Sequence, residues 1–287
     1  MVDQIAPDLE RFAVRPGPGV AALSAVLEDP ANSLLGLDFD GTLSPIIDRP
    51  ENAVIHPEGA RALDRLSRRL GTVAIITGRP ARAAVELGGL AQLAGAERMV
   101  VLGQYGAERW DGASGEFTIP PPPEGIAQVR EAVTALVDEV GIPGVTIENK
   151  FRAIGIHWRT AADPQRATAA LIERARAIAA EHDFGVEPGR SVLEIRPPGK
   201  DKGMALAELI AERGVRAQIF GGDDLGDLPA YDEVVRQRAL GIPGLLIASA
   251  SPEQNALLER ADVVCHGPAE VATWLHLLAD ELDRRAA

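Results

Sequence analysis

The segment that most constrains the fold is a short apolar run followed at once by two acidic side chains. Leu34–Leu37 precedes Asp38 and Asp40, and Gly41 and Thr42 come next. Side chains two positions apart on a strand share a face, so both carboxylates would leave the end of the strand together. Open α/β sheets bind their ligands at the carboxyl ends of their strands. The pattern therefore predicts a parallel sheet with a polar site at this strand end.

Two carboxylates this close together repel each other unless a cation or a shared proton relieves them. The chain has five histidines and one cysteine, so oxygen atoms dominate the available ligands, and oxygen ligands suit Mg²⁺ better than Zn²⁺. A strand that ends in an acidic turn without a ligand is the alternative, because Asp and Gly both favour turns.

Three later segments have the composition of companions to such a site. Thr72–Ile76 is a β-branched run typical of a buried parallel strand, and it leads into Thr77, whose hydroxyl suits a phosphoryl oxygen. Lys202 opens a helical stretch over Met204–Glu212 and offers a point charge for phosphate. Taken singly, Thr77 fits a plain turn better than a site, and Lys202 fits a solvated surface better.

The third companion is a strand, Gln218–Phe220, that runs into a glycine-rich acidic cluster. The three acids of this cluster would repel one another without a cation; they are Asp223, Asp224 and Asp227. A further acidic strand end supports the metal site predicted at the first one.

In this order, the four segments resemble the four motifs of the haloacid dehalogenase superfamily of phosphatases. A closer resemblance, to the trehalose-6-phosphate phosphatases, rests on the region between the second and third motifs. There Glu148-Asn149-Lys150 and His157-Trp158-Arg159 look like that family's Glu-x-Lys and His-x-Arg stretch. Leu193–Pro197 also looks like its approach to the third motif. The resemblance runs from about Leu34 to Ala230.

The resemblance implies a reaction in which the phosphoryl group passes through a carboxylate. Asp38 would be the nucleophile and form an aspartyl-phosphate. Asp40 would protonate the departing sugar oxygen and later accept a proton from water. Phosphoryl oxygens would be bound by the remaining two groups, so the predicted catalytic residues are Asp38, Asp40, Thr77 and Lys202.

The predicted cofactor is Mg²⁺, which would offset the repulsion between the nucleophile and the phosphate. It would be held by Asp38, by the backbone carbonyl of Asp40 and by Asp223. Asp227 and Asp224 would orient this shell, with Asp224 the better candidate for a purely outer role. The predicted metal residues are therefore Asp38, Asp40, Asp223 and Asp227.

The segment between the second and third motifs is expected to act as a lid whose polar groups bind sugar hydroxyls. The resemblance assigns substrate binding to Arg79, Glu148, Lys150, Arg159 and Glu194. His157 suits a structural role equally well, and Trp158 is expected to pack. The alternative for the charged residues is a salt-bridged strand surface, the usual fate of alternating charges on an exposed sheet face.

Two residues depart from the family pattern at the fourth motif. Members commonly carry Gly-Asp-Asp-x-Thr-Asp-Glu, whereas here Gly226 replaces Thr and Leu228 replaces Glu. The acids that a metal site would use are retained, so we expect hydrolysis to survive. The change bears on the positioning of the metal or the sugar, and hence on the exact substrate.

Composition narrows the class of partner and the compartment. The net charge is −13, from 29 basic and 42 acidic residues, which argues against nucleic acid because phosphate-backbone binding needs a basic surface. The single cysteine, Cys265, permits no internal disulfide, and no apolar stretch or secretion signal predicts a membrane association. We therefore expect a cytoplasmic protein that binds a small sugar phosphate; nothing in the composition indicates an oligomeric state.

The predicted fold class is α/β, a Rossmann-like parallel-sheet haloacid dehalogenase core with an inserted α+β cap domain. The expected order is an N-terminal segment (1–30), the first part of the core (31–107), the cap (108–199) and the second part of the core (200–287). The change from core to cap is placed at a hairpin, Glu108–Trp110 and Gly115–Ile119, because the sequence texture changes there.

Three functions fit these observations. The favoured one is an Mg²⁺-dependent phosphatase that hydrolyses trehalose 6-phosphate to trehalose and phosphate, the last step of trehalose biosynthesis. The second keeps this mechanism but acts on another phosphorylated disaccharide or glycosyl-polyol, since fold does not fix substrate. The third is a non-catalytic sugar-phosphate sensor, which would have no need of Asp40.

Overall fold

The computed structural model describes residues 15, 17–47, 49–189, 191–250 and 257–287. Contacts between residues divide the chain into two units. The first contains the described residues up to Ile119 together with Asp201–Ala287, and the second is Pro120–Lys200. Of the expected N-terminal segment (1–30), residues 1–14 and 16 lie outside the described residues. The described remainder belongs to the first unit.

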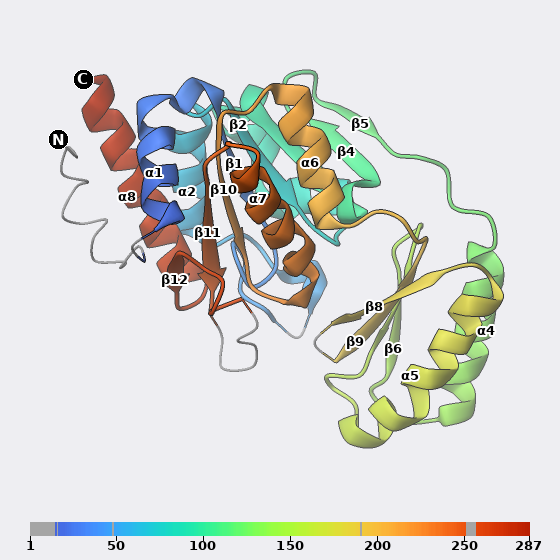
Figure 1. The fold of residues 1–287 in the computed structure, drawn as a ribbon. Helices are drawn as coiled ribbons and strands as arrows, with labels where there is room; N and C mark the ends of the chain where they lie inside the picture. The colour runs from blue at the N-terminus through green and yellow to red at the C-terminus, as the bar shows by residue number, and fades with distance from the viewer. Residues whose placement is uncertain (1–14, 16, 48, 190, 251–256) are drawn as a thin grey trace. The chain divides into compact units, whose positions relative to one another are not determined.

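The first unit is built on an eight-stranded sheet with the order β12-β11-β10-β1-β2-β3-β4-β5 (Figure 1). All neighbours from β12 to β3 are parallel, and β4 and β5 are antiparallel additions at one edge. The strands are β1 (Ser33–Leu37), β2 (Thr72–Ile76), β3 (Met99–Gly103), β4 (Glu108–Asp111), β5 (Glu116–Thr118), β10 (Ala217–Gly222), β11 (Gly244–Ser249) and β12 (Val263–Cys265).

The chain leaves β1 toward β2 and β3 on one side, and it returns to β10 and β11 on the other. The strand order therefore reverses between β1 and β10. Ligands of open α/β sheets bind in the crevice beyond the carboxyl ends of the strands at such a point. The acidic segments that follow β1 and β10 both lie there.

Helices cover both faces of this sheet (Figure 1). One face carries α1 (Pro18–Glu28), α2 (Pro57–Ser67), α3 (Ala81–Gly88) and α8 (Pro268–Ala286), and the other carries α6 (Lys202–Arg213) and α7 (Leu228–Ala239). Leu35 and Leu37 of β1 pack toward the first group and Leu34 toward the second. Because successive side chains of a strand point to opposite faces, a strand buried on both sides reads as a continuous apolar run.

The hairpin β4–β5 lies in a different place from the one predicted. It was assigned to the inserted domain, but β4 is hydrogen-bonded antiparallel to β3, with Val101 opposite Trp110. Trp110 is buried in the core of the first unit. The change in texture at residue 108 therefore marks the switch from parallel to antiparallel pairing within one sheet, and the second unit begins at Pro120.

The second unit is an antiparallel sheet with the order β6-β7-β9-β8 and two helices. Its elements are α4 (Ile126–Val140), β6 (Thr146–Asn149), β7 (Ile154–His157), α5 (Pro164–Glu181), β8 (Gly185–Gly189) and β9 (Val192–Arg196). One face of the sheet packs its isoleucines and leucine, such as Ile156 and Leu193, against α4 and α5.

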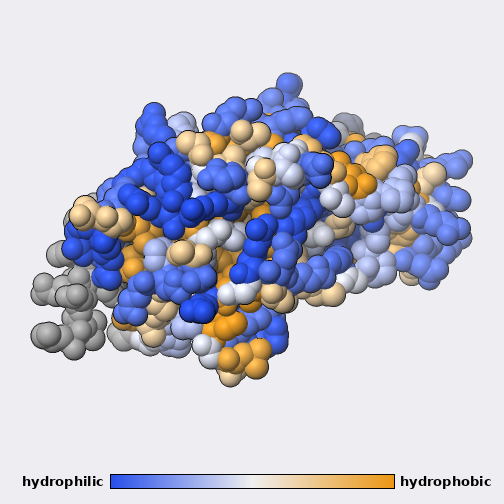
Figure 2. Space-filling view, turned by 90° about the horizontal axis from the view of Figure 1, so that it is seen from above, coloured by the Kyte–Doolittle hydropathy of each residue, from blue (hydrophilic) through white to orange (hydrophobic). Residues whose placement is uncertain are grey.

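The surface is mainly hydrophilic in the view of Figure 2, with apolar residues scattered among charged ones. No helix within the described ranges is both long and apolar enough to cross a bilayer. The fold class expected from the sequence, an α/β protein dominated by parallel strands, is confirmed.

The packing of α2 against the sheet provides a test of the core. Leu63 is 0% exposed, whereas Leu240, at the end of α7, is 65% exposed. We expect Leu63→Ala to lower the free energy of unfolding by about 2–5 kcal/mol, because it removes buried methyl groups and leaves a cavity. Leu240→Ala should change it by less than about 0.5 kcal/mol. Urea unfolding of the two variants would measure both values, and equal losses would contradict this assignment of the core.

Candidate active site

The strand register brings the two acidic segments together. Leu37 of β1 lies opposite Gly221 of β10, and the Asp38 N–H donates to the Gly221 carbonyl at 2.9 Å. Asp38 and Asp223 therefore leave adjacent strands at the same edge of the sheet. Both residues are buried, with 5% of the surface of each exposed.

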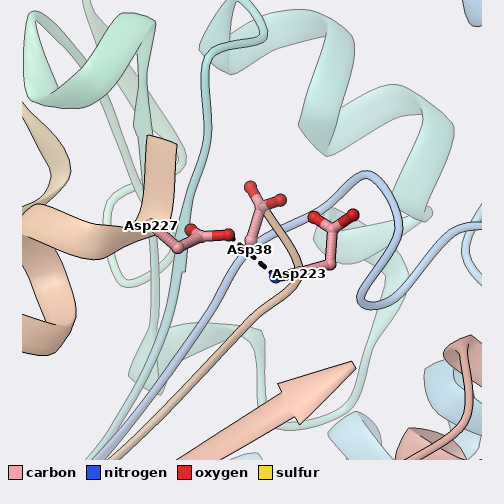
Figure 3. Close-up of side chains that lie close together, drawn as sticks. All are labelled: Asp38, Asp223 and Asp227. Carbon is pink, nitrogen blue, oxygen red and sulfur yellow. Dashed lines mark hydrogen bonds between the residues drawn. The ribbon is translucent and has the colours of Figure 1, made fainter. Parts of the chain in front are cut away.

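Three carboxylates converge at this edge (Figure 3). One oxygen each of Asp38, Asp223 and Asp227 lie within 4.8 Å of one another, and all three residues are buried. This convergence requires a glycine at position 41, in the turn after β1. Gly41 has φ +76°, and a Cβ built on it would lie 2.1 Å from Asp223 Oδ2. The Gly of the first motif thus makes room for an acid of the fourth.

Lys202 is the first residue of α6, and it inserts its ammonium group among these acids. Its Nζ lies 2.6 Å from Asp38 Oδ1 and donates to Asp227 Oδ1 at 2.8 Å. The other oxygen of Asp227 accepts the backbone N–H groups of Asp223 and Asp224, at 2.9 and 3.2 Å. The side chain of Asp201 caps the start of the helix by accepting the Met204 N–H at 2.7 Å. One acid, Asp227, therefore ties the helix that carries the lysine to the loop that carries the other acids.

Burial and charge shift the titration of this cluster in two directions. Burial raises the pKa of Asp38 well above its usual range, opposed by Lys202 and reinforced by Asp227, Asp224 and Asp40. Burial by itself would lower the pKa of Lys202, but the charges of Asp227, Asp38 and Asp224 outweigh it and raise that pKa well above the ordinary value. The lysine is therefore charged, and the acids packed around it outnumber it.

The residues present fit a hard divalent cation. The candidate ligand atoms are all carboxylate oxygens, which Mg²⁺ prefers over nitrogen or sulfur ligands. The convergence of three buried acids points the same way, because each would need a compensating charge when ionised. Asp227 already accepts three hydrogen bonds, so its geometry suits an orienting role better than direct ligation.

Asp40 is bound by an arginine that was assigned to the substrate from the sequence. Arg79 Nε donates to Asp40 Oδ2 and Arg79 Nη2 to Asp40 Oδ1, both at 2.7 Å. The guanidinium carbon lies 5.2 Å from the centre of the Phe39 ring, and Nη1 donates to the Pro50 carbonyl at 2.8 Å. Arg79 is thus held on several sides and orients the carboxyl group of Asp40 with a two-pronged contact.

Thr77 follows β2 at the same edge of the sheet and is buried. Its N–H donates to the Leu102 carbonyl at 3.0 Å, and its hydroxyl oxygen accepts the Arg79 N–H at 3.1 Å. The N–H of Ala81, at the start of α3, donates to Glu108 Oε2 at 2.8 Å. The helix start behind Thr77 therefore binds an internal carboxylate, and the hydroxyl is the group left to meet a ligand.

In the second unit, a row of polar residues crosses the sheet on the face opposite α4 and α5. Glu148 lies opposite Gly155, Gly155 opposite Glu194, and Glu194 opposite Glu187. Cross-strand partners share a face, and the apolar side chains between them occupy the other. The lack of a side chain at Gly155 leaves room for His157, because a Cβ built on Gly155 would lie 2.9 Å from His157 Nε2.

Three of the predicted sugar-site residues, Glu148, Lys150 and Glu194, make one network with His157 on this face. Lys150 donates to Glu194 Oε2 and lies 3.8 Å from Glu148 Oε2. His157 Nε2 and Glu148 Oε2 are 2.9 Å apart. The second oxygen of Glu194, Oε1, is buried and has no hydrogen-bond partner among the residues that the structure describes. A buried carboxylate oxygen without a partner is costly, so this one is available to a ligand hydroxyl.

Trp158 and Arg159 follow β7. Trp158 is buried in the core of the second unit, as expected for a packing residue, and Arg159 is half-buried in the turn after β7. Sequence reasoning missed Ser249, which ends β11 and whose hydroxyl donates to the Gly41 carbonyl at 2.6 Å. A hydroxyl residue at the carboxyl end of a buried strand was the signal that could have identified it.

The parallel sheet carries an acid after β1, a hydroxyl after β2, a lysine at the start of α6 and further acids after β10, which is the order that the resemblance to the haloacid dehalogenase superfamily implied. A hydrolase of that kind from Bacteroides thetaiotaomicron superposes with a TM-score of 0.60 at 18% identity, covering 88% of this chain and 98% of that chain. The C-terminal domain of trehalose-6-phosphate phosphatase from C. albicans superposes with a TM-score of 0.73 at 23% identity, covering 91% and 96%. At these identities the likeness establishes the fold.

Sequence comparison establishes the family. The family model for trehalose-phosphatase matches residues 36–260. A trehalose-phosphate phosphatase of Mycobacterium avium (strain 104) is 31% identical over 301 residues, covering 98% of this chain and 73% of that protein. The chain belongs to the trehalose-phosphatase family, as the resemblance of its motifs suggested.

The position of Asp227 yields a stability prediction. Asp227→Ala would remove one of the two acids that pair with buried Lys202 and the acceptor of the Asp223 and Asp224 N–H groups, so we expect the free energy of unfolding to fall by about 3–5 kcal/mol. Asp232→Ala is the matched control, because Asp232 pairs with Arg260 while 69% of its side chain is exposed. Its loss should stay below about 1 kcal/mol. Urea unfolding measures both, and an Asp227 variant as stable as the control would contradict the anchoring role.

Proposed function

We propose that this chain is an Mg²⁺-dependent phosphatase that hydrolyses trehalose 6-phosphate to trehalose and phosphate, the last step of trehalose biosynthesis. The single observation that carries the proposal is the buried contact between Asp38 and Lys202 beside two further acids, in a chain of the trehalose-phosphatase family. This contact provides a nucleophile and a phosphate-binding cation at one strand end.

The proposed reaction has two steps on the chain's own residues. Asp38 attacks phosphorus and forms an aspartyl-phosphate as the bond to the sugar oxygen breaks, and Asp40 gives its proton to that oxygen. Asp40 then accepts a proton from the water that attacks the aspartyl-phosphate, which restores both aspartates and releases phosphate. Thr77 and Lys202 bind phosphoryl oxygens as charge shifts among them.

The metal would be held by Asp38, the backbone carbonyl of Asp40 and Asp223, with Asp227 and Asp224 orienting the loop. When bound, Mg²⁺ would neutralise charge between the nucleophile and the phosphoryl oxygens. The buried, all-oxygen donor set supports this choice of ion. Burial disfavours the ionised form of Asp38, and the charge of a bound Mg²⁺ would offset that cost.

The polar face of the second unit supports a sugar as the leaving group. Glu148, Lys150 and Glu194 present charged hydrogen-bonding groups on one face of the sheet. Sugar rings carry closely spaced hydroxyls, which such a cluster can bind in several directions. Arg159 is the remaining proposed contact. The proposed setting is the cytoplasm, and the proposed partner is the sugar phosphate alone.

The decisive measurement is phosphate release from a panel of sugar phosphates, with and without Mg²⁺. We expect trehalose 6-phosphate to be hydrolysed far faster than glucose 6-phosphate, and only when Mg²⁺ is present. Asp38→Asn keeps the shape of the side chain but removes the nucleophile, so it should release no phosphate while remaining folded. Equal turnover of the two substrates would remove the disaccharide from the proposal, and an active Asp38→Asn variant would remove the aspartyl-phosphate.

Glu194 provides a test of the sugar site. Glu194→Gln keeps the size of the side chain but loses its charge, and a hydrogen bond to a charged group is worth about 1.5–3 kcal/mol. We expect kcat/KM for trehalose 6-phosphate to fall by about ten- to over a hundredfold, with little change for an aryl phosphate. Glu139→Gln, on the exposed surface of α4, is the control and should leave both rates unchanged. A loss shared equally by both substrates would indicate a structural salt bridge instead.

A further inference from the structure

Two residues after β3 adopt a backbone conformation that side chains other than glycine rarely take. Gln104 has φ 47° and Tyr105 has φ 59°, both in the left-handed region, which is unfavourable for residues with a Cβ. Gln104 is buried, with 6% of its surface exposed. Such strain persists only where the surrounding structure holds it, and it is concentrated at functional sites. The hydrogen bonds of the pair show what holds it here.

Gln104 and Tyr105 bind all three carbonyl groups of the turn that follows β2. The Tyr105 N–H donates to the Thr77 carbonyl at 3.0 Å, and the Gln104 N–H donates to the Arg79 carbonyl at 2.8 Å. The side-chain amide of Gln104 donates to the Gly78 carbonyl, between them, at 2.6 Å. The left-handed conformation aims both backbone N–H groups at the turn, and the side chain completes the set.

This turn carries two groups of the proposed reaction that act on different atoms. Thr77 presents its hydroxyl to the phosphoryl group, and Arg79 fixes the carboxyl group of Asp40, which faces the leaving group. Only one residue, Gly78, separates them. Any rotation of the Gly78 peptide would therefore displace the hydroxyl and the guanidinium together.

We propose that Gln104 is a positioning residue that fixes the Thr77–Arg79 turn, and so sets phosphate binding and proton transfer to the leaving group through one amide. The proposal rests on the proposed function. Gln104 touches neither the substrate nor the reacting atoms in this assignment; it acts through the Gly78 carbonyl. Its loss leaves a carbonyl without its donor and releases a peptide that sterics alone do not hold, since Gly78 has no side chain.

The test uses Gln104→Met, which keeps the length of the side chain and removes its donor, and Gln104→Glu, which puts an acceptor against the Gly78 carbonyl. For both we expect kcat/KM with trehalose 6-phosphate to fall by about ten- to a hundredfold, or about 1.4–2.7 kcal/mol at 1.36 kcal/mol per factor of ten. The loss with p-nitrophenyl phosphate should be smaller, because its leaving group needs no proton. Inhibition by inorganic phosphate should weaken several-fold, since Thr77 is displaced.

Two comparison variants separate positioning from folding. Gln237→Met removes a similar bond, because Gln237 is 5% exposed and its amide donates to Glu233 at 2.7 Å, but it lies near the end of α7. This variant should lose a comparable amount of thermal stability and keep the wild-type kinetics and phosphate inhibition. Asp40→Asn supplies the pattern of a lost proton donor: a severe loss with the sugar ester, a mild one with the aryl ester and unchanged inhibition by phosphate.

The outcomes distinguish this proposal from the proposed function. If the wild-type protein and Gln237→Met hydrolyse trehalose 6-phosphate while Gln104→Met loses more on the sugar ester than on the aryl ester and binds phosphate more weakly, the positioning role stands. Wild-type kinetics in both Gln104 variants would overturn it. Equal losses of kcat/KM on the two substrates would also overturn it, if phosphate inhibition were unchanged and the loss of activity matched the loss of folded protein. A wild-type protein that releases no phosphate from any ester would instead overturn the proposed function.

Discussion

The ion pairs of Lys202 with Asp38 and Asp227 are the interaction on which the rest of the site depends. An ammonium group this deeply buried is tolerated only when it is paired, and here it is held between two carboxylates at 2.6 and 2.8 Å. Asp227 also accepts two backbone N–H groups of the loop after β10. The same acid that pairs with Lys202 therefore fixes the position of the loop that carries Asp223. The start of α6, the end of β1 and the end of β10 are thereby locked to one another. A site with three acids and one lysine keeps an excess of negative charge at its centre, which is the condition that a divalent cation relieves.

The two units divide the proposed reaction according to their architectures. A parallel sheet brings several strand ends to one edge, which suits a compact cluster of catalytic groups. An antiparallel sheet with helices on one face leaves the other face open, and its cross-strand pairs lay polar groups out in a row. In this chain the first unit carries the acids, Thr77 and Lys202. The second carries the row from Glu148 to Glu187, in which Gly155 leaves room for His157 and Glu194 has a buried oxygen that no described residue hydrogen-bonds.

The sequence predicted those features that depend on local pattern. The strands at Leu34–Leu37 and Thr72–Ile76 read as apolar runs because both faces of the parallel sheet are covered. The four motifs located Asp38, Thr77, Lys202 and Asp223 because strand ends in a parallel sheet meet at one edge. The failures share a different cause. The assignment of the hairpin at β4 and β5 to the cap was wrong because alternating strands look the same at the edge of a large sheet as in a small separate one. The Arg79–Asp40 and Ser249–Gly41 contacts join segments 39 and 208 residues apart, and no local pattern records such pairs.

Gln104 illustrates why such contacts escape a reading of the sequence. Gln-Tyr-Gly at a strand end indicates a turn. The hydrogen bonds of this turn, however, depend on positive φ angles that Gln and Tyr disfavour. A glycine at position 104 would adopt the same φ more easily, yet it would lose the amide that binds Gly78. A side chain at position 78 would collide with the Tyr105 ring, because a Cβ there would lie 2.8 Å from the Tyr105 hydroxyl. The strained pair and the glycine opposite it therefore depend on each other. Gln104 and Tyr105 occupy a backbone conformation that favours glycine, and Gly78 leaves the space that the Tyr105 ring fills. The cost of this backbone strain is offset by the hydrogen bonds that hold the Thr77–Arg79 turn in place.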